Sequence, residues 1–275
     1  MTGIETWALS ALLGGIVGAI MALTGAGGGV LAVPLLVFGL HLGVKEAAPV
    51  ALLAVGAAAW LGALLGLREG IVRYRAAALI GSVAMAVAPL GVALAHRLPP
   101  APLLLGFAAV LAWTAWRMSG LRLRPEHPQA PPRIQPCRVN PGEGRLRWTA
   151  PCAWVLGGTG LFSGLLTGLL GVGGGFVIVP SLTRYTDLDA RSIAATSLAV
   201  IALASVSGLL AAGGQGGLNL GLALSFGGAA VAALLLGRHW GRALPPALLQ
   251  RGFAAVCLAV AGLMLARGLG WLPAP

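Results

Sequence analysis

The chain has 275 residues, of which 58% are hydrophobic and only 9% are charged. Soluble domains carry charges on about a quarter of their residues, so this composition excludes a soluble globular protein and indicates a polytopic membrane protein. The formal net charge of +11 would suggest nucleic-acid binding in a soluble protein. Here the arginines cluster beside apolar segments, which favours a topological role, and we expect contact with membrane lipid and no nucleic-acid partner.

Ten apolar segments follow one another along the chain, and a helix that crosses the bilayer needs about 20 apolar residues. The segments of the first half are 5–23, 28–40, 47–67, 76–95 and 103–118. Those of the second half are 152–170, 173–184, 192–212, 218–236 and 247–266. The second and seventh segments are too short to cross comfortably, and we interpret them as half-helices. The sequence therefore predicts an all-α polytopic membrane protein.

A proline- and arginine-rich stretch, residues 119–149, separates the two sets of segments. It holds six prolines and few large apolar residues, a composition typical of an exposed, extended connection. We therefore divide the chain into a first transmembrane repeat, 1–118, a cytoplasmic linker, 119–149, and a second transmembrane repeat, 150–275.

The two halves share sequence at one constant offset. Residues 25–34 return 146 positions later as residues 171–180, with every glycine and the proline in register. The same offset aligns the Gly-Phe-Ala-Ala-Val of residues 106–110 with that of residues 252–256. One fixed offset without insertion indicates an internal duplication.

Charged residues predict how the halves are oriented, because cytoplasmic loops are enriched in Lys and Arg. The loop between the third and fourth segments carries Arg68, Arg73 and Arg75, whereas its counterpart, residues 213–219, carries none. Equivalent loops thus face opposite sides, which predicts inverted-topology repeats of about five segments each. With the linker inside and both termini outside, the only basic residues left outside are Lys45, Arg97 and Arg267.

The glycine runs have the chemistry of an anion site. A helix that begins after such a run presents free N–H groups and the positive end of its dipole, and glycine lets a ligand approach the backbone closely. Paired breaks at matching positions of two halves are typical of transporter binding sites. A cation carrier usually requires an Asp or Glu within the membrane. No Asp or Glu lies deep within an apolar segment of this chain, so we expect an anionic or neutral substrate. The alternative is that the glycines only let helices pack closely.

The candidate substrate-binding residues are the glycines of the two runs and the hydroxyl groups beside or shortly after them. The glycines are Gly25, Gly27, Gly28, Gly29, Gly171, Gly173, Gly174 and Gly175. The hydroxyl-bearing residues are Thr24, Thr167, Thr196 and Ser197. We expect Pro34 and Pro180 to bend or break the short helices. Four other membrane serines are interpreted as bonding backbone carbonyls, and they are Ser82, Ser163, Ser205 and Ser207.

Cysteine and histidine give no sign of a metal or a catalytic centre. Cys137, Cys152 and Cys257 lack metal-ligand spacing. Although Cys137 and Cys152 could meet, we interpret all three as isolated thiols, because the cytosolic side is reducing. The four histidines form no cluster, and no hydrolase or metalloprotease motif is present. We therefore expect neither an enzyme nor a cofactor.

At its glycine runs the chain resembles the sulfite exporter TauE/SafE family. Members have two related halves, each with a Gly-x-Gly-Gly-Gly-like turn followed by an apolar stretch and a proline, here residues 25–34 and 171–180. The Ala-Thr-Ser-Leu of residues 195–198 also looks like a family element, and the first half departs from it with Pro-Val-Ala-Leu at residues 49–52. The resemblance implies a multi-pass protein of the bacterial inner (plasma) membrane that exports sulfite or a small organosulfonate.

These observations together favour a secondary transporter of a small sulfur oxyanion, which works by alternating access around the two half-helix ends. A channel-like pore for a small anion or neutral solute, and a non-transporting membrane scaffold, are the alternatives. The sequence leaves open which anion is carried, the direction of flux, the coupling ion and the oligomeric state, a homodimer included.

Overall fold

The computed structural model describes residues 3–24, 27–120, 137, 149–213, 219–240 and 246–269. The first half contains α1 (Gly3–Thr24), the 3-10 helix η1 (Gly27–Leu31), α2 (Ala32–Gly39), α3 (Val44–Arg68), α4 (Tyr74–Arg97) and α5 (Pro100–Gly120). The second half contains α6 (Ala150–Leu170), α7 (Gly175–Tyr185), α8 (Ala190–Gly213), α9 (Leu220–Trp240) and α10 (Pro246–Gly268). Every predicted apolar segment is a helix, and the all-α prediction is confirmed.

Six of the described helices are long and apolar enough to cross a membrane by length and composition, and they are α1, α3, α4, α6, α8 and α9. Large apolar side chains are exposed on the outside of the bundle, with Trp154 82% and Leu210 74% exposed. Such a surface is unfavourable in water and favourable in lipid. The chain is therefore a multi-pass membrane protein.

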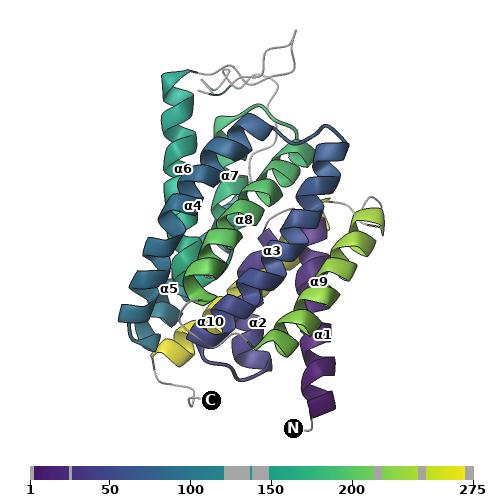
Figure 1. Ribbon diagram of the computed structural model, residues 1–275, viewed down its shortest axis with the longest axis vertical. Helices are drawn as coiled ribbons and strands as arrows, with labels where there is room; N and C mark the ends of the chain where they lie inside the picture. Colours follow the sequence, from purple (N-terminus) through teal and green to yellow (C-terminus); the bar gives the residue numbers. More distant parts are fainter. Residues whose placement is uncertain are drawn as a thin grey trace.

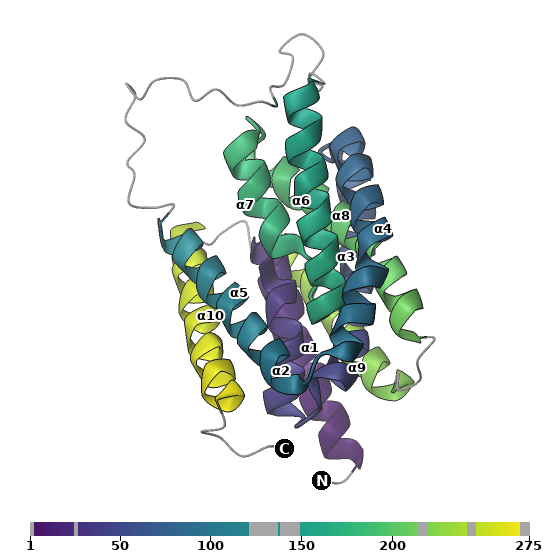
Figure 2. The same cartoon turned by 90° about the vertical axis from the view of Figure 1, so that its left-hand side faces the viewer.

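The helices run between two ends of the bundle (Figures 1 and 2). The start of α1 and the end of α10 lie at one end, and the end of α5 and the start of α6 lie at the opposite end. In each half the short helix turns back, so that α2 returns to the end where α1 began and α7 returns to the end where α6 began. The first helices of the two halves, α1 and α6, thus run in opposite directions.

Basic residues of the described chain lie at both ends of the bundle. At the end where α6 begins, Arg238 of α9 pairs with Glu69, just after α3, at 2.7 Å between Nη2 and Oε1. At the other end, the Nζ of Lys45 donates to the backbone oxygen of His96 at 3.2 Å, and Arg267 lies over the ring of Phe38.

Two close helix contacts occur twice, at positions 146 apart. Gly14 of α1 lies against the backbone of Phe226 in α9, and its counterpart Gly160 in α6 lies against the backbone of Ile80 in α4. Ile80 is itself the counterpart of Phe226. One turn further on the same exchange recurs for the pairs Gly18–Ala230 and Gly164–Ala84. Small residues allow such backbone approach between membrane helices.

The centre of the bundle is the contact between α3 and α8. In the most apolar stretch of each of these two helices 61% of the residues are buried, against 28–44% in the other candidate spans. Here too each contact has an equivalent in which the two halves change roles. Gly62 of α3 lies against Leu198 of α8, and its counterpart Gly208 of α8 lies against Leu52 of α3. The helices α3 and α8 therefore form the buried centre of the bundle.

One prediction about the linker is wrong. Cys137 and Cys152 form a disulfide, with their Cα atoms 5.0 Å apart, instead of two isolated thiols. Cys137 is fully buried, and its N–H donates to the backbone oxygen of Tyr185 at 3.3 Å, so this part of the linker lies over the end of α7 beside the start of α6. Cys257 is a free, buried cysteine as predicted. Residues 121–136 and 138–148 of the linker lie outside the described part of the chain.

Candidate functional site

The two glycine runs meet at the buried centre of the bundle. A Cβ on Gly29 would lie 3.1 Å from the carbonyl oxygen of Val172. The Cγ1 of Val55, from α3, lies 3.0 Å from that Cβ position and 3.3 Å from the Cβ position of Gly173. Two segments that are 146 residues apart in sequence are thus in contact around one side chain of α3.

The run in the second half is a turn that only glycine adopts easily. Gly171, Gly173 and Gly174 have φ angles of +70°, +73° and +64°, in the left-handed region that side chains rarely occupy. Gly171 ends α6 as its C-cap and Gly174 starts α7 as its N-cap. The helical break lies at these glycines, while Pro180 lies inside α7, which continues to Tyr185.

The run in the first half has a different backbone. Gly27, Gly28 and Gly29 lie in η1, which leads directly into α2, and Gly25 lies outside the described residues. Pro34 is the third residue of α2, a position at which the missing N–H has no intrahelical partner to lose. In both halves the break therefore lies at the glycines, and neither proline breaks its helix; that the prolines bend these helices stays a prediction.

The turn in the second half presents backbone donors. The N–H groups of Val177 and Ile178 both donate to the carbonyl oxygen of Gly174, at 3.0 and 3.4 Å. The first turn of a helix leaves its earliest N–H groups without an intrahelical acceptor, which applies to Gly175 and Phe176. Together with the positive end of the α7 dipole, these N–H groups favour negative charge at the turn.

Most of the hydroxyl groups predicted for the site form hydrogen bonds to backbone groups away from the glycine turn. Thr24 Oγ1 donates to Ile20 O at 2.7 Å. Ser197 Oγ donates to Ala194 O at 2.8 Å. Thr196 Oγ1 accepts the N–H of Arg73 at 3.1 Å, which ties the start of α8 to the start of α4 rather than to the glycine turn.

Thr167 is the predicted hydroxyl residue that does lie at the turn. A Cβ on Gly174 would lie 2.8 Å from Thr167 Oγ1. The hydroxyl of Thr167 donates to Ser163 O at 2.7 Å, one turn earlier in α6. The side chain of Thr167 therefore lies against the turn, but its hydroxyl group donates its hydrogen bond within α6.

Two serines that sequence reasoning assigned to backbone bonding also lie at the turn. Ser163 Oγ donates to the carbonyl oxygen of Gly174 at 3.3 Å, so it fastens the turn to α6. Ser205 Oγ, from α8, is buried without a hydrogen-bond partner among the residues that the structure describes and lies 3.8 Å from the Cβ position of Gly173. The signal that would have found them is the offset of 146, because their counterparts are the apolar Val17 and Ala59.

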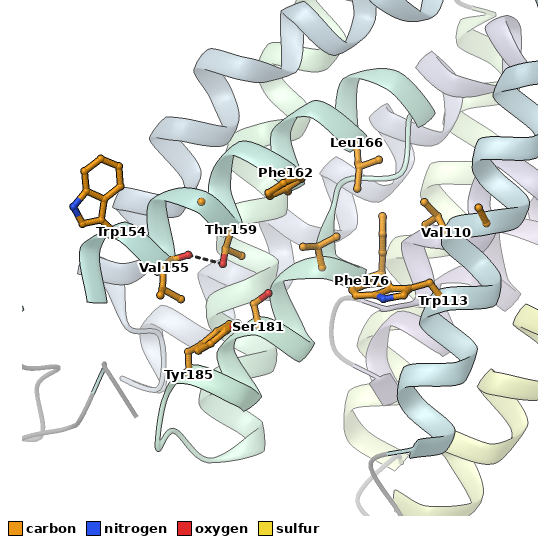
Figure 3. Close-up of a pocket in the computed structure, with 13 residues that line it drawn as sticks. Val110, Trp113, Trp154, Val155, Thr159, Phe162, Leu166, Phe176, Ser181 and Tyr185 are labelled. Carbon is orange, nitrogen blue, oxygen red and sulfur yellow. Dashed lines mark hydrogen bonds between the residues drawn. The ribbon is translucent and has the colours of Figure 1, made fainter. Parts of the chain in front are cut away.

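A cavity of about 580 Å³ lies between α5, α6 and α7, and Phe176 and Val177 of the first turn of α7 line it. Figure 3 shows its aromatic side chains, with Phe176 beside Trp113 and with Tyr185 farther along α7. None of its lining residues is charged, and the hydroxyl of Thr159 donates within its own helix to Val155 O at 2.8 Å. Such a lining suits an apolar group better than an oxyanion.

Within the described residues, no group of three or more His, Cys, Asp or Glu side chains has the arrangement of a metal site. The side chains against the glycine turn are apolar or carry hydroxyl groups. A multi-pass membrane protein whose broken helices meet at its centre belongs to the structural class of transporters with discontinuous helices.

The family model described as Sulfite exporter TauE/SafE matches residues 10–264, and the chain belongs to this family. No curated protein and no solved structure matches the chain. Membership confirms the resemblance at the glycine runs. It implies a membrane permease for sulfite or a related sulfur anion, and not an enzyme.

Proposed function

We propose that this protein is a secondary transporter that exports a small sulfur oxyanion, sulfite or an organosulfonate, bound at the glycine turns in the middle of the bilayer. The observation that carries the proposal is the contact of the two runs at the buried centre, around Val55. Family membership supports the class of substrate. The positive end of α7 supports its charge, because anions bind at helix N-termini.

The donors of this site come mainly from the backbone. Gly175 and Phe176 offer N–H groups, and the left-handed glycines before them bring no side chain that would block an approaching anion. An anion held by neutral dipoles binds without the strong Coulomb attraction of a buried Arg or Lys. Such moderate binding suits a carrier, which must also release its cargo.

We further propose that the two halves are inverted-topology repeats and that transport follows alternating access. The opposite directions of α1 and α6 support this (Figure 2), as do the paired contacts Gly14–Phe226 and Gly160–Ile80. Repeats of this kind move against each other around a fixed central site. The grouping of basic residues supports an inner-membrane orientation with the start of α6 in the cytoplasm, whereas the disulfide of Cys137 and Cys152 at the same end favours the oxidising side.

A thermal-stability measurement on the detergent-purified protein tests the function. The panel is sulfite, sulfate, thiosulfate, sulfoacetate and chloride at fixed ionic strength. We expect sulfite or one organosulfonate to raise the stability of the wild type, by about 2.7 kcal/mol at 100 times its Kd. The variant Gly174→Leu should lose this response, because Leu is strained at φ +64° and would collide with Ser163.

The control variant is Gly157→Leu, also in the second half, where an added Cβ meets nothing within 4 Å. It should keep the ligand response of the wild type. If no anion of the panel stabilises the wild type, the proposed site is wrong and a scaffold role gains support. If the purified protein in liposomes gives a flux of sulfite that does not saturate, a channel replaces the carrier.

A further inference from the structure

We propose that Ser205 is a substrate-binding residue, whose hydroxyl donates a hydrogen bond to the oxyanion at the Gly173–Gly174 turn, and that the hydroxyl donor of the site therefore comes from the second half alone. This inference rests on the proposed function and adds to it a side chain and a donor that distinguishes acceptor oxygens from other ligands.

Ser205 differs from the serines beside it on the same helix. Ser197 and Ser207 donate to backbone oxygens three residues earlier, at 2.8 and 3.1 Å, which is the usual solution for a serine in a membrane helix. Ser205 Oγ is buried and has no partner within the described residues, and the residue is only 3% exposed. A buried hydroxyl without a partner is destabilising, so its presence calls for a function.

The position of Ser205 shows where its hydroxyl points. It lies between Gly56 of α3 and Gly173 of the turn, and the Cβ positions of these glycines are 3.4 and 3.8 Å from Ser205 Oγ. Neither neighbour has a side chain that would cover the hydroxyl. Ser205 thus faces the backbone that leads to the N–H groups of Gly175 and Phe176.

The combined donors fit an oxyanion. The hydroxyl comes from α8 and the backbone N–H groups come from the first turn of α7, so the oxyanion would have donors from two helices. Both kinds of group donate hydrogen bonds to a negatively charged oxygen. Because the N–H groups come from α7 and the hydroxyl comes from α8, a bound oxyanion would join these two helices. That is how a substrate can favour one arrangement of a carrier over another.

The first half has no equivalent donor. The counterpart of Ser205 at the offset of 146 is Ala59, and the counterparts of Ser163 and Thr167 are Val17 and Met21. Gly28 and Gly29 lie in a 3-10 helix instead of a left-handed turn. A hydroxyl donor from the second half alone follows from this asymmetry.

The test compares Ser205→Ala with Ser207→Ala, which removes a hydroxyl from the same helix two positions later. Sulfite affinity is measured by calorimetry in nanodiscs, and the stability of the ligand-free protein by thermal unfolding. We expect Ser205→Ala to weaken sulfite binding by about ten- to hundred-fold, the loss typical of a hydrogen bond to a charged group. Its ligand-free stability should equal or exceed that of the wild type, since no bond is lost. Ser207→Ala should bind as the wild type does.

A structural role for Ser205 would give the opposite pattern, with lower ligand-free stability and unchanged affinity, and would overturn the inference. The variant Ala59→Ser, made in the Ser205→Ala background, should not restore binding, and restoration would disprove a hydroxyl donor confined to the second half. If the wild type itself binds no sulfite and no other anion of the panel, the proposed function fails. If the wild type binds and Ser205→Ala binds equally, only the role of Ser205 fails.

Discussion

The two halves of this chain agree in their helix packing and differ in the turn at the centre. Gly14 and Gly160 make equivalent close contacts with helices of the opposite half. The turn of the second half has left-handed glycines with Ser163 and Ser205 against it, whereas the first half has a 3-10 helix. The two halves therefore share their packing, while the hydroxyl groups lie against the turn of the second half.

The reason for this difference lies in what each position tolerates. A side chain at Gly14 or Gly160 would overlap the backbone of the neighbouring helix, and backbone cannot move aside as a flexible side chain can. A hydroxyl group and an apolar side chain of similar size can replace one another without changing helix positions. Selection for a binding site can thus alter one half and leave the architecture intact.

Substituting valine at two equivalent glycines tests the shared packing with the largest expected effect. We expect Gly18→Val and Gly164→Val each to lower the free energy of unfolding by about 3 kcal/mol, because overpacking against rigid backbone is costly. The two residues oppose the backbone of Ala230 and Ala84. The measurement is unfolding by SDS titration from mixed micelles, with Gly15→Val, where an added Cβ meets nothing within 4 Å, as the control. Clearly unequal losses would show that the halves do not pack alike.

The disulfide joins the linker to the second half and has no equivalent in the first half, where the counterpart of Cys152 is Thr6. It closes a loop with a sequence separation of 15. In protein purified without reductant, we expect reduction to lower the free energy of unfolding by about 2 kcal/mol, chiefly through the greater freedom of the unfolded chain. Alkylation under denaturing conditions should label only Cys257 before reduction and all three cysteines after it. Three labelled cysteines without reductant would contradict the pairing.

Much of the architecture was predictable because it is local. The lengths of the apolar segments and the glycine runs identified every helix, the short ones ending at Gly39 and Tyr185 included. The features that were missed depend on distant contacts. Cys137 reaches Cys152 only because it pairs with the end of α7, and nothing local marks that. Ser205 looks like any other membrane serine until the turn of Gly173 is placed beside it.

The same reasoning separates the predicted hydroxyls. Thr196 and Ser197 looked like site residues because they lie early in the eighth segment, within an Ala-Thr-Ser-Leu that looks like a family element. Thr196 instead accepts the N–H of Arg73, and Ser197 bonds its own helix. Position along the sequence thus identifies candidates, and only the fold shows which of them, such as Thr167, lie at the turn.

The smallest expected effect on stability concerns the capping of two equivalent helices, α8 by Asp189 and α3 by Gly43. Asp189, just before α8, accepts the N–H of Ser192 on its Oδ2 at 3.3 Å, while its counterpart Gly43 before α3 makes no side-chain cap. The hydrogen bond from the Ser192 side chain, with backbone N–H groups, holds the pKa of Asp189 below 3.8 despite some desolvation that raises it. We expect Asp189→Ala to lower the free energy of unfolding by about 1 kcal/mol at neutral pH.

The pH dependence of this capping effect has a definite sign. Because the folded protein holds the pKa of Asp189 below its ordinary value of 3.8, the unfolded chain binds the proton more readily, and stability rises with pH through this range. The stability difference between the wild type and Asp189→Ala should be complete well above pH 3.8 and should shrink as the pH falls toward the lowered pKa. Gly43→Ala, which removes no cap, serves as the control in the first half. A difference that persists unchanged in acid would show that Asp189 acts through packing rather than as a charged cap.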